Sequence, residues 1–512
     1  MGVFVVRRLT VSFLILIAST FLMFALVSAS GDPLGDLRLD TSPNRQQKIE
    51  QRTEQLHLDK SVPQRYLIWA GGVVKCVVPG QDCDLGTTIR GQDVTSLLKQ
   101  AMGVTFRLVT AALVLAILLG VTVGIVSSLR QYSGFDYTIT FSAFLFFSLP
   151  VFWVAVLLKQ YLAIGVNNWY ADPVISLGFG VVFALLSGFT WGAVIGGDRR
   201  RKWIIRGVAA VLTFALLYYL QAVDWFTHPA LGPGLIIVLA LGSAVVVTAL
   251  VAGLTHRSVL NACLVTAGVG GLAQFFVTPW LQDPKWASWT NILLLAVIAV
   301  IVAAVIGYLM GGLDRPQAIR ATILTALATG FFIVVDQLLR AVPSYSDIVG
   351  GRILATIGSS TPNFDGTFWE SQLDTFTHLL LPTLSILLIS YATYSRYSRA
   401  TMLDTMHQDY VRTARAKGLT ERTVVMRHAF RNALIPLTTL AAFDFGALIS
   451  GAIITETIFG WRGMGVLFVN GLAQSDPYPV MGFYIVTAIS VVVFNMLADM
   501  SYAYLDPRIR LT

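Results

Sequence analysis

The chain has few charged residues. Asp, Glu, Lys and Arg make up 12% of its 512 positions, whereas hydrophobic residues make up 55% and the mean hydropathy is +0.70. Soluble domains carry about 25% charged residues, so this composition excludes an ordinary water-soluble enzyme or binding domain. Its apolar runs reach the length of spanning helices, and composition therefore predicts an all-α membrane protein.

Sequence signatures of enzyme sites are also absent. No GxxxxGK[ST] phosphate-binding loop occurs, so we expect this chain not to bind ATP itself. The His residues form no HExxH motif and no pair four positions apart, which argues against a metal site. They are His57, His228, His256, His378, His407 and His428. We expect no cofactor, no metal and no catalytic residue in this chain.

Cysteine is scarce, with three residues in the whole chain, and this excludes a disulfide scaffold. Cys76 and Cys83 flank a polar, turn-forming stretch. If that region lies outside the cytoplasm, the two could form a local disulfide, and otherwise they are free thiols. Cys263 lies in an apolar run, where we expect it to contribute to packing.

Twelve apolar runs are long enough to cross a bilayer, which takes about 20 residues. They lie near residues 9–29, 104–128, 138–164, 174–195, 203–222, 233–254, 258–278, 290–312, 320–341, 376–395, 433–455 and 480–503. The first run resembles a signal peptide, with Arg7 and Arg8 before it and Val27-Ser28-Ala29 at its end. It is about long enough to span a membrane, so we interpret it as a retained helix. In the third run we expect Pro150 to kink the helix.

The distribution of charge predicts the orientation of these spans. The net charge is +8, but the basic residues lie between apolar runs, which fits membrane topology better than nucleic-acid binding. Arg199 to Lys202, Arg257, Arg315 and Arg320 occupy alternate short loops, and the intervening loops carry almost no basic residue. The positive-inside rule therefore predicts both termini in the cytoplasm.

The longest polar segment of the second half runs from Met402 to Leu437, between two apolar runs. The stretch from Asp409 to Lys417 favours a helix, and Gly418 provides a natural stop. Thr420 can begin a second short helix through Arg431, with Val424, Val425, Met426 and Phe430 on its apolar side. The sequence predicts a helix, a glycine turn and a helix. The alternative is a basic loop that only sets orientation.

Two strings within this segment, YVRTARAKGL and RHAFRNALIP, resemble the cytoplasmic coupling loop of bacterial ABC importer permeases of the dipeptide and oligopeptide family. The general loop has Glu-Ala-Ala, three residues and Gly, whereas this chain has Arg412 at the Glu position. Further similar strings are HLLLPTL, with His378 and Pro382, the stretch from Glu456 to Pro479, and YLDPRIR from Tyr504 to Arg510. The resemblance covers residues 1–165 and 345–512.

The resemblance implies a permease subunit that forms half of a translocation pathway for di- or oligopeptides in the bacterial inner membrane. Related members of the same family carry nickel or other small solutes, so the substrate stays open. The implied partners are a second permease, two ATPase subunits that bind ATP and Mg²⁺, and an extracytoplasmic binding protein. The implied ATPase-coupling residues are Asp409, Tyr410, Arg412, Ala414, Arg415, Lys417, Gly418, Arg422 and Pro436. The implied docking residues for the binding protein are Glu456, Phe459, Gly463 and Gly465.

These features predict a six-helix permease core interrupted by a six-helix insertion. The expected parts are a first helix at 1–30, an extracytoplasmic region at 31–100, core helices at 101–165, the insertion at 172–343, an outer loop at 344–375, and the remaining core at 376–512 with the coupling loop at 402–432. The insertion carries few polar groups, so we interpret it as a peripheral bundle that stabilises the complex or binds a partner. A second transport path is the less favoured reading.

Two other functions fit part of the pattern. An autonomous twelve-helix secondary transporter needs buried charged residues, and Asp444 is the one carboxylate near the middle of a span. It could face a pathway or a polar neighbour. A membrane enzyme or scaffold built on the insertion would need converging polar groups. Asp336 and Arg340 could pair on one helix face. Asn495 and Asp499 could bond to a neighbouring helix or line a gate, and we favour packing.

Overall fold

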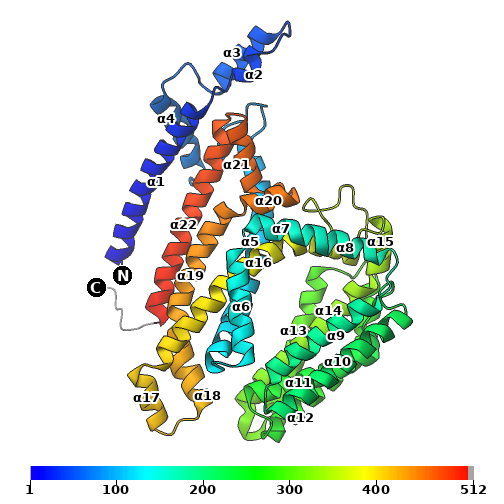
Figure 1. Ribbon diagram of the computed structural model, residues 1–512. Coiled ribbons are helices and arrows are strands. Elements are labelled where there is room, and N and C mark those ends of the chain that lie inside the picture. The colour runs from blue at the N-terminus through cyan, green and yellow to red at the C-terminus, as the bar shows by residue number, and fades with distance from the viewer. Residues whose placement is uncertain (1, 506–512) are drawn as a thin grey trace. The chain divides into compact units, whose positions relative to one another are not determined.

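The computed structural model describes residues 2–505, and helices form nearly all regular structure in that range (Figure 1). The only strand-like pairing among the described residues is an isolated bridge between Thr87 and Asp93. Of the described helices, 11 are long and apolar enough to cross a membrane, which confirms the predicted all-α membrane class. The run predicted at 433–455 corresponds to α19 (Phe430–Gly451), which carries Arg431 and Asp444 and is not among the 11.

The chain folds into two compact units. The first comprises Met1–Gln160, Thr356–Ser359 and Leu379–Thr512, and the second comprises Tyr161–Ala355 and Ser360–His378. The predicted insertion at 172–343 lies inside the second unit. The string YLDPRIR extends beyond the described residues, and so do the side chains of Arg7 and Arg8.

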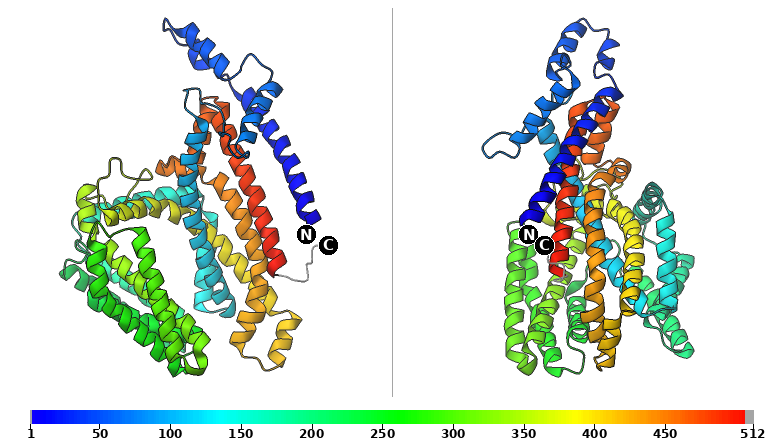
Figure 2. Two further views of the ribbon diagram at one scale, coloured as in Figure 1. Left: turned by 180° about the vertical axis from the view of Figure 1, so that it is seen from behind. Right: turned by 90° about the vertical axis from the view of Figure 1, so that its left-hand side faces the viewer.

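The first unit contains the helices that precede and follow the second. They are α1 (Gly2–Ser30), α2 (Gly35–Arg38), α3 (Arg45–Gln55), α4 (Val62–Lys75), α5 (Val94–Leu129), α6 (Gly134–Ser148), α7 (Val151–Leu157), the later part of α16 (Phe368–Met406), α17 (Asp409–Ala416), α18 (Glu421–Thr423), α19, α20 (Ile453–Phe459), α21 (Met464–Ala473) and α22 (Pro477–Leu505). Helix α22 packs against α19 and beside α1 (Figure 2).

Small residues bring α5 close to α16. A Cβ added to Gly120 would lie 2.5 Å from Cβ of Tyr394, and one added to Gly124 would meet the Ser398 hydroxyl. The Ser398 hydroxyl donates to the Gly120 carbonyl at 3.2 Å. Gly120 and Gly124 are four residues apart, the spacing that lets membrane helices approach backbone to backbone. The contact therefore fixes α5 against α16, the helix that leads into α17.

Two predicted spans differ from the helices that contain them. The run at 104–128 belongs to a helix that begins at Val94, because Asp93 accepts hydrogen bonds from the amides of Thr95 and Ser96. The run at 138–164 is not one kinked helix. Helix α6 ends at Ser148, and Pro150 has an extended backbone before α7. Pro382, in contrast, lies inside the 39-residue helix α16.

The second unit contains the remaining helices. They are α8 (Gly165–Tyr170), α9 (Leu177–Ile195), α10 (Arg199–Ala222), α11 (Gly232–Val251), α12 (Arg257–Gln282), α13 (Trp289–Met310), α14 (Arg315–Arg340), α15 (Val342–Ile348) and the start of α16. Small residues fill the core shared by α11, α12 and α14, among them Ala240, Cys263 and Ala321. Cys263 is thus a packing residue, as predicted.

Asp336 joins two helices of this unit. Its carboxylate pairs with Arg340 one turn later, with Nε and Oδ2 2.7 Å apart. The other oxygen accepts from the amides of Leu231 and Gly232, at 2.8 and 3.0 Å, where α11 begins. The predicted pair on one helix face is therefore present. Its carboxylate also satisfies backbone donors that a helix start leaves unpaired.

Candidate functional site: the coupling segment

The coupling segment comprises α17, the turn at Gly418, and α18. Gly418 has a φ of +73°, and its amide donates to the Arg415 carbonyl at 2.9 Å, while the Leu419 amide donates to the Ala414 carbonyl at 3.4 Å. These two bonds form a Schellman motif, which ends a helix at a left-handed residue. The glycine stop predicted from the sequence is therefore present and has a defined geometry.

An ion pair and a cap hold the two sides of this turn together. The Arg415 guanidinium contacts both Glu421 carboxylate oxygens, at 2.8 and 3.2 Å. Hydrogen bonding between them raises the pKa of Arg415 and lowers that of Glu421, although both side chains are substantially exposed. The Thr420 hydroxyl accepts from the Thr423 amide at 3.4 Å. Arg415 is therefore engaged within the segment rather than free to meet a partner.

The second helix of the segment differs from the prediction. It does not end at Arg431, because α18 continues through a π-helical stretch at Val424–Ala429 directly into α19. Of the four residues predicted on its apolar side, Val424 and Val425 are buried, whereas Met426 is 57% exposed. The segment is thus continuous with a long helix and is not a separate loop.

A small apolar core fixes α17 to the ends of the long helices. Val411 and Ala414 of α17 cluster with Val424, Val425 and Met402, and Ile125 of α5 packs against this cluster. Figure 1 shows α17 and α18 beyond the ends of α16 and α19. A displacement of α17 must therefore carry the ends of α16 and α19, since close-packed side chains transmit movement instead of absorbing it.

The predicted coupling residues fall into three groups. Most are exposed on the coupling segment: Asp409, Tyr410, Arg412, Arg415, Lys417, Gly418 and Arg422. Ala414 is buried beneath them and supports α17. Pro436 lies inside α19 and is therefore not part of the coupling segment.

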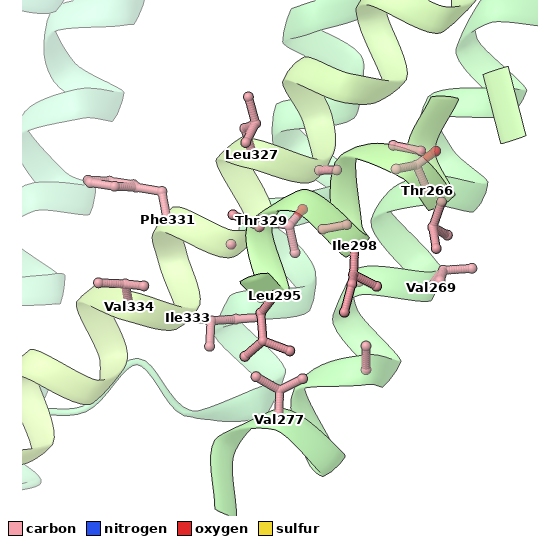
Figure 3. Close-up of a pocket in the computed structure, with 18 of the residues that line it drawn as sticks. Thr266, Val269, Val277, Leu295, Ile298, Leu327, Thr329, Phe331, Ile333 and Val334 are labelled. Carbon is pink, nitrogen blue, oxygen red and sulfur yellow. The ribbon is translucent and has the colours of Figure 1, made fainter. Parts of the chain in front are cut away.

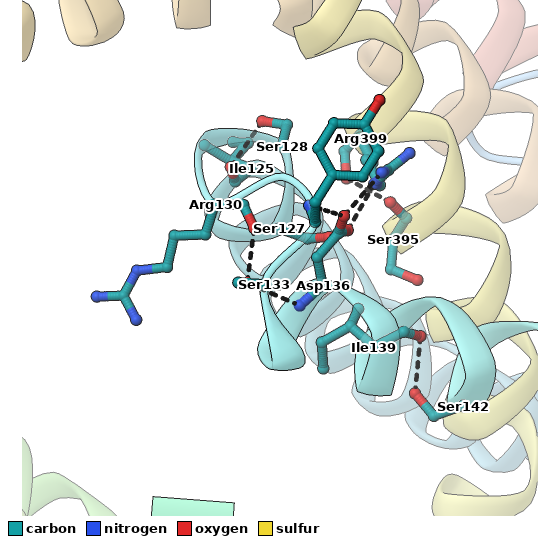
Figure 4. A network of polar contacts seen from close by, with 12 residues as sticks. Ile125, Ser127, Ser128, Arg130, Ser133, Asp136, Ile139, Ser142, Ser395 and Arg399 are labelled. Atoms are coloured by element: carbon teal, nitrogen blue, oxygen red, sulfur yellow. Dashed lines mark hydrogen bonds and ion pairs between the residues drawn. The ribbon is translucent and has the colours of Figure 1, made fainter. Parts of the chain in front are cut away.

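Behind the segment, α16 is anchored by a charged network that sequence reasoning missed (Figure 4). Arg399 of α16 makes two hydrogen bonds to the carboxylate of Asp136 in α6. Asp136 also accepts from the Ser127 hydroxyl and, at 3.0 Å, from the Tyr132 amide. The available signal was a lone acidic residue at the start of one apolar run and an arginine at the end of another.

The outer segment that follows α19 is built around a buried carboxylate. Glu456 is fully buried and accepts from the Thr105 hydroxyl at 2.6 Å and the Gly465 amide at 2.8 Å. The Thr105 hydroxyl oxygen in turn accepts from the Met464 amide at 2.9 Å. Burial raises the pKa of Glu456, while these hydrogen bonds oppose that shift. Together they tie α20 and the start of α21 to α5.

This geometry corrects the predicted docking surface. The side chains of Glu456 and Phe459 are 0% and 1% exposed, so they cannot contact a partner directly. Gly463 and Gly465 are also buried, and they leave room for the carboxylate: a Cβ on Gly463 would meet it at 2.3 Å. The four residues form an internal joint because the carboxylate needs backbone amides that only a close approach can supply.

Comparison with known proteins shows which family the chain belongs to. Residues 318–511 match the family described as "Binding-protein-dependent transport system inner membrane component". The oligopeptide transport system permease protein OppB of Mycobacterium tuberculosis (strain ATCC 25618 / H37Rv) is 36% identical over 225 residues, which are 43% of this chain and 69% of the relative. The chain belongs to this permease family.

Other permeases of the family are similar over shorter stretches. The dipeptide transport system permease protein DppB of Escherichia coli (strain K12) is 40% identical over 146 residues, 28% of this chain and 42% of the relative. The oligopeptide transport system permease protein AppB of Bacillus subtilis (strain 168) is 43% identical over 136 residues, 27% of this chain and 43% of the relative. The resemblance to peptide ABC importer permeases is confirmed, and the chain is a multi-pass inner membrane permease.

The permease also carries a disulfide in the region before α5. Cys76 and Cys83 are bonded, with their Cα atoms 4.1 Å apart. Nearby, Asp476 accepts from the Ile89 amide at 2.8 Å and joins this region to the turn between α21 and α22. Phe24, Tyr66 and Trp69 share an apolar cluster with Tyr478. Residues 31–100, the predicted extracytoplasmic region, are therefore packed against α1 and α22 within the first unit.

An apolar cavity lies in the second unit, among α12, α13 and α14 (Figure 3). Its volume is about 380 Å³. Thr266 and Thr329 line this cavity, but each hydroxyl donates to a carbonyl of its own helix. The hydroxyls that line the cavity are therefore paired within their own helices.

Proposed function

We propose that this permease forms half of the translocation pathway of an ATP-driven importer for di- or oligopeptides. Two ATPase subunits would bind ATP and Mg²⁺ and dock on the coupling segment, a second permease would complete the pathway, and an extracytoplasmic binding protein would deliver the substrate. Both termini would lie in the cytoplasm, on the side of the coupling segment.

The observation that carries the proposal is the rigid attachment of the coupling segment. Its exposed face bears Arg412, Lys417 and Arg422, and its buried face is packed to the ends of three long helices. Movement of a docked ATPase would thereby rotate or shift those helices, and alternating access needs such a rigid-body step. The Arg415–Glu421 pair adds stiffness across the turn.

The test is ATP-dependent uptake in vesicles, combined with recovery of ATPase subunits when the permease is purified in mild detergent. Arg412→Glu with Lys417→Glu reverses two exposed charges, and we expect loss of ATPase recovery and of uptake with normal membrane insertion. Arg45→Glu with Arg90→Glu makes the same charge change on the exposed surface of residues 31–100 and serves as the control. The control should retain ATPase recovery.

Arg415 requires a different design because it pairs with Glu421. Arg415→Glu alone should reduce uptake, and adding Glu421→Arg should restore it if the pair stiffens the turn. No restoration would mean that Arg415 itself meets the ATPase. Uptake without ATP by a chain that purifies alone would contradict the proposal and favour an autonomous secondary transporter.

A further inference from the structure

Helices α9 and α10 form a hairpin, and the two helices pack mainly against each other. Within the second unit, the described residues of α10 pack against α9 and against no other helix to a comparable extent. The shared face is lined by Gly180, Ala184, Gly188 and Gly192 on α9, and no residue of α10 is fully buried. Large apolar side chains therefore cover the outside of a hairpin whose two helices are each long enough to span the membrane.

A groove runs along this hairpin from its loop end. It measures about 420 Å³. Its lining side chains are Trp191, Ile195, Ile204, Ile205, Val208, Ala209, Leu212 and Thr213. The polar groups among these side chains are the Trp191 indole N–H and the Thr213 hydroxyl, and the latter is bonded to the Ser187 hydroxyl at 2.8 Å. From Ile204 to Thr213 the groove extends about 13 Å along α10, close to the depth of one leaflet of a ~30 Å hydrocarbon core.

Four basic residues stand at the mouth of the groove. Arg199, Arg200, Arg201 and Lys202 begin α10, two to five residues before its first lining residue, Ile204, and Arg199, Arg200 and Arg201 are exposed. Among the described residues, none of the four takes part in an ion pair. The three-residue connection between two spanning helices must emerge at a membrane surface, so these cations lie at headgroup depth.

We propose that the α9–α10 hairpin binds an anionic diacyl phospholipid. One acyl chain lies in the groove between Ile195 and Thr213, and the phosphate contacts Arg200 and Arg201. The lining is almost entirely apolar and does not suit a hydrophilic ligand. A zwitterionic phospholipid also carries a phosphate, but it brings a cation of its own to the basic cluster, whereas an anionic phospholipid adds only negative charge. Basic residues next to a spanning helix attract anionic headgroups in this way. The inference does not depend on the transported substrate.

Arg206 lies one turn below the cluster but belongs to the hairpin itself. Its guanidinium lies over the rings of Phe189 and Trp203, at 4.8 and 4.9 Å from their centroids. Its side chain also fills the notch at Gly192, where an added Cβ would meet it at 2.6 Å. Substitution of Arg206 would disturb the hairpin, so the test leaves it unchanged.

Native mass spectrometry of the full chain in mild detergent, with any subunits that copurify, tests the headgroup. Phosphatidylglycerol should be retained in preference to phosphatidylcholine with the same acyl chains. Arg200→Gln with Arg201→Gln should weaken its retention roughly 20- to 30-fold, at about fivefold per cation. The matched control, Arg257→Gln with Arg320→Gln, removes two exposed cations from the starts of α12 and α14 in the same unit and should leave retention unchanged. Equal retention of both lipids, or displacement by inorganic phosphate alone, would overturn the proposal.

The groove is tested separately. Ala209→Phe should fill it and weaken phosphatidylglycerol retention without changing the elution volume or the melting temperature. A photoreactive amino acid at position 209 provides a second test, which remains usable if the Ala209→Phe variant does not fold. Cross-linking to lipid in native membranes supports the proposal. Cross-linking mainly to another transmembrane polypeptide would show that a partner helix, not a lipid, covers the hairpin.

Discussion

Arg399 and Asp136 form a two-point ion pair between α16 and α6, with Nε–Oδ1 at 2.9 Å and Nη2–Oδ2 at 3.0 Å. The aspartate side chain is 4% exposed and the arginine side chain 30%. Arg399 lies on the helix that leads into the coupling segment, next to Ser398, which contacts α5. The pair therefore fixes the base from which the coupling segment projects.

Removing one partner of this pair should destabilise the permease. Asp136→Asn would leave the partly buried Arg399 without a counter-charge, and we expect a loss of roughly 2 kcal/mol, less than for a fully buried pair because Arg399 reaches solvent. Thermal unfolding in detergent measures it. The double variant with Arg399→Gln should lose less than the sum of the two single variants. Additive losses would show that the pair contributes no coupling.

Alanine substitution should have opposite effects at Gly465, beside Glu456, and at Gly103 in α5. A Cβ on Gly465 would lie 2.6 Å from Cα of Ile453, so Gly465→Ala should cost at least about 2 kcal/mol through a backbone clash. Gly103, exposed in α5, has open space around an added Cβ. Gly103→Ala should therefore be neutral or stabilise by about 0.5–1 kcal/mol. Equal melting temperatures for the two variants would contradict the structure.

Asp476 should make stability depend on pH. Burial raises its pKa from 3.8 to about 6, so between these values the folded state binds more protons than the unfolded state. Its contribution to the free energy of unfolding therefore falls as pH rises from about 4 to about 6 and is constant above that. Asp476→Asn should remove this part of the slope and stabilise the protein at pH 7 by up to about 3 kcal/mol. An unchanged slope in melting temperature against pH would refute the assignment.

Gly418 should tolerate substitution in a graded order. Its φ of +73° favours Gly and, less well, Asn, while an added Cβ has open space. Gly418→Asn should be mild, Gly418→Ala should cost about 1–2 kcal/mol, and Gly418→Pro cannot adopt this φ and should abolish ATP-driven uptake. Uptake rates and insertion levels measure the series. Normal uptake by the proline variant would contradict the claim that uptake requires a rigid turn at Gly418.

Local signals were sufficient for the class of fold and for the ends of several helices. Long apolar runs predict spanning helices because a bilayer requires internal backbone hydrogen bonds, and Gly418 and Thr420 were recognisable because caps and stops depend on neighbours within one turn. The family was recognisable from separated strings. Pro150 was misread because the same residue can kink a helix or stand between two, as Pro382 inside α16 and Pro150 before α7 demonstrate.

The tertiary structure decided what the polar residues do. Glu456 belongs to a motif-like stretch that the sequence suggested was an outer surface, yet its partners include Thr105, 351 positions earlier in the chain. Asp136 and Arg399 are 263 positions apart. Sequence by itself determined which segments become helices, since that depends on hydropathy and nearby residues. Only the packed structure determined which carboxylate lies inside and which cation it meets, since those pairings depend on how distant helices come together.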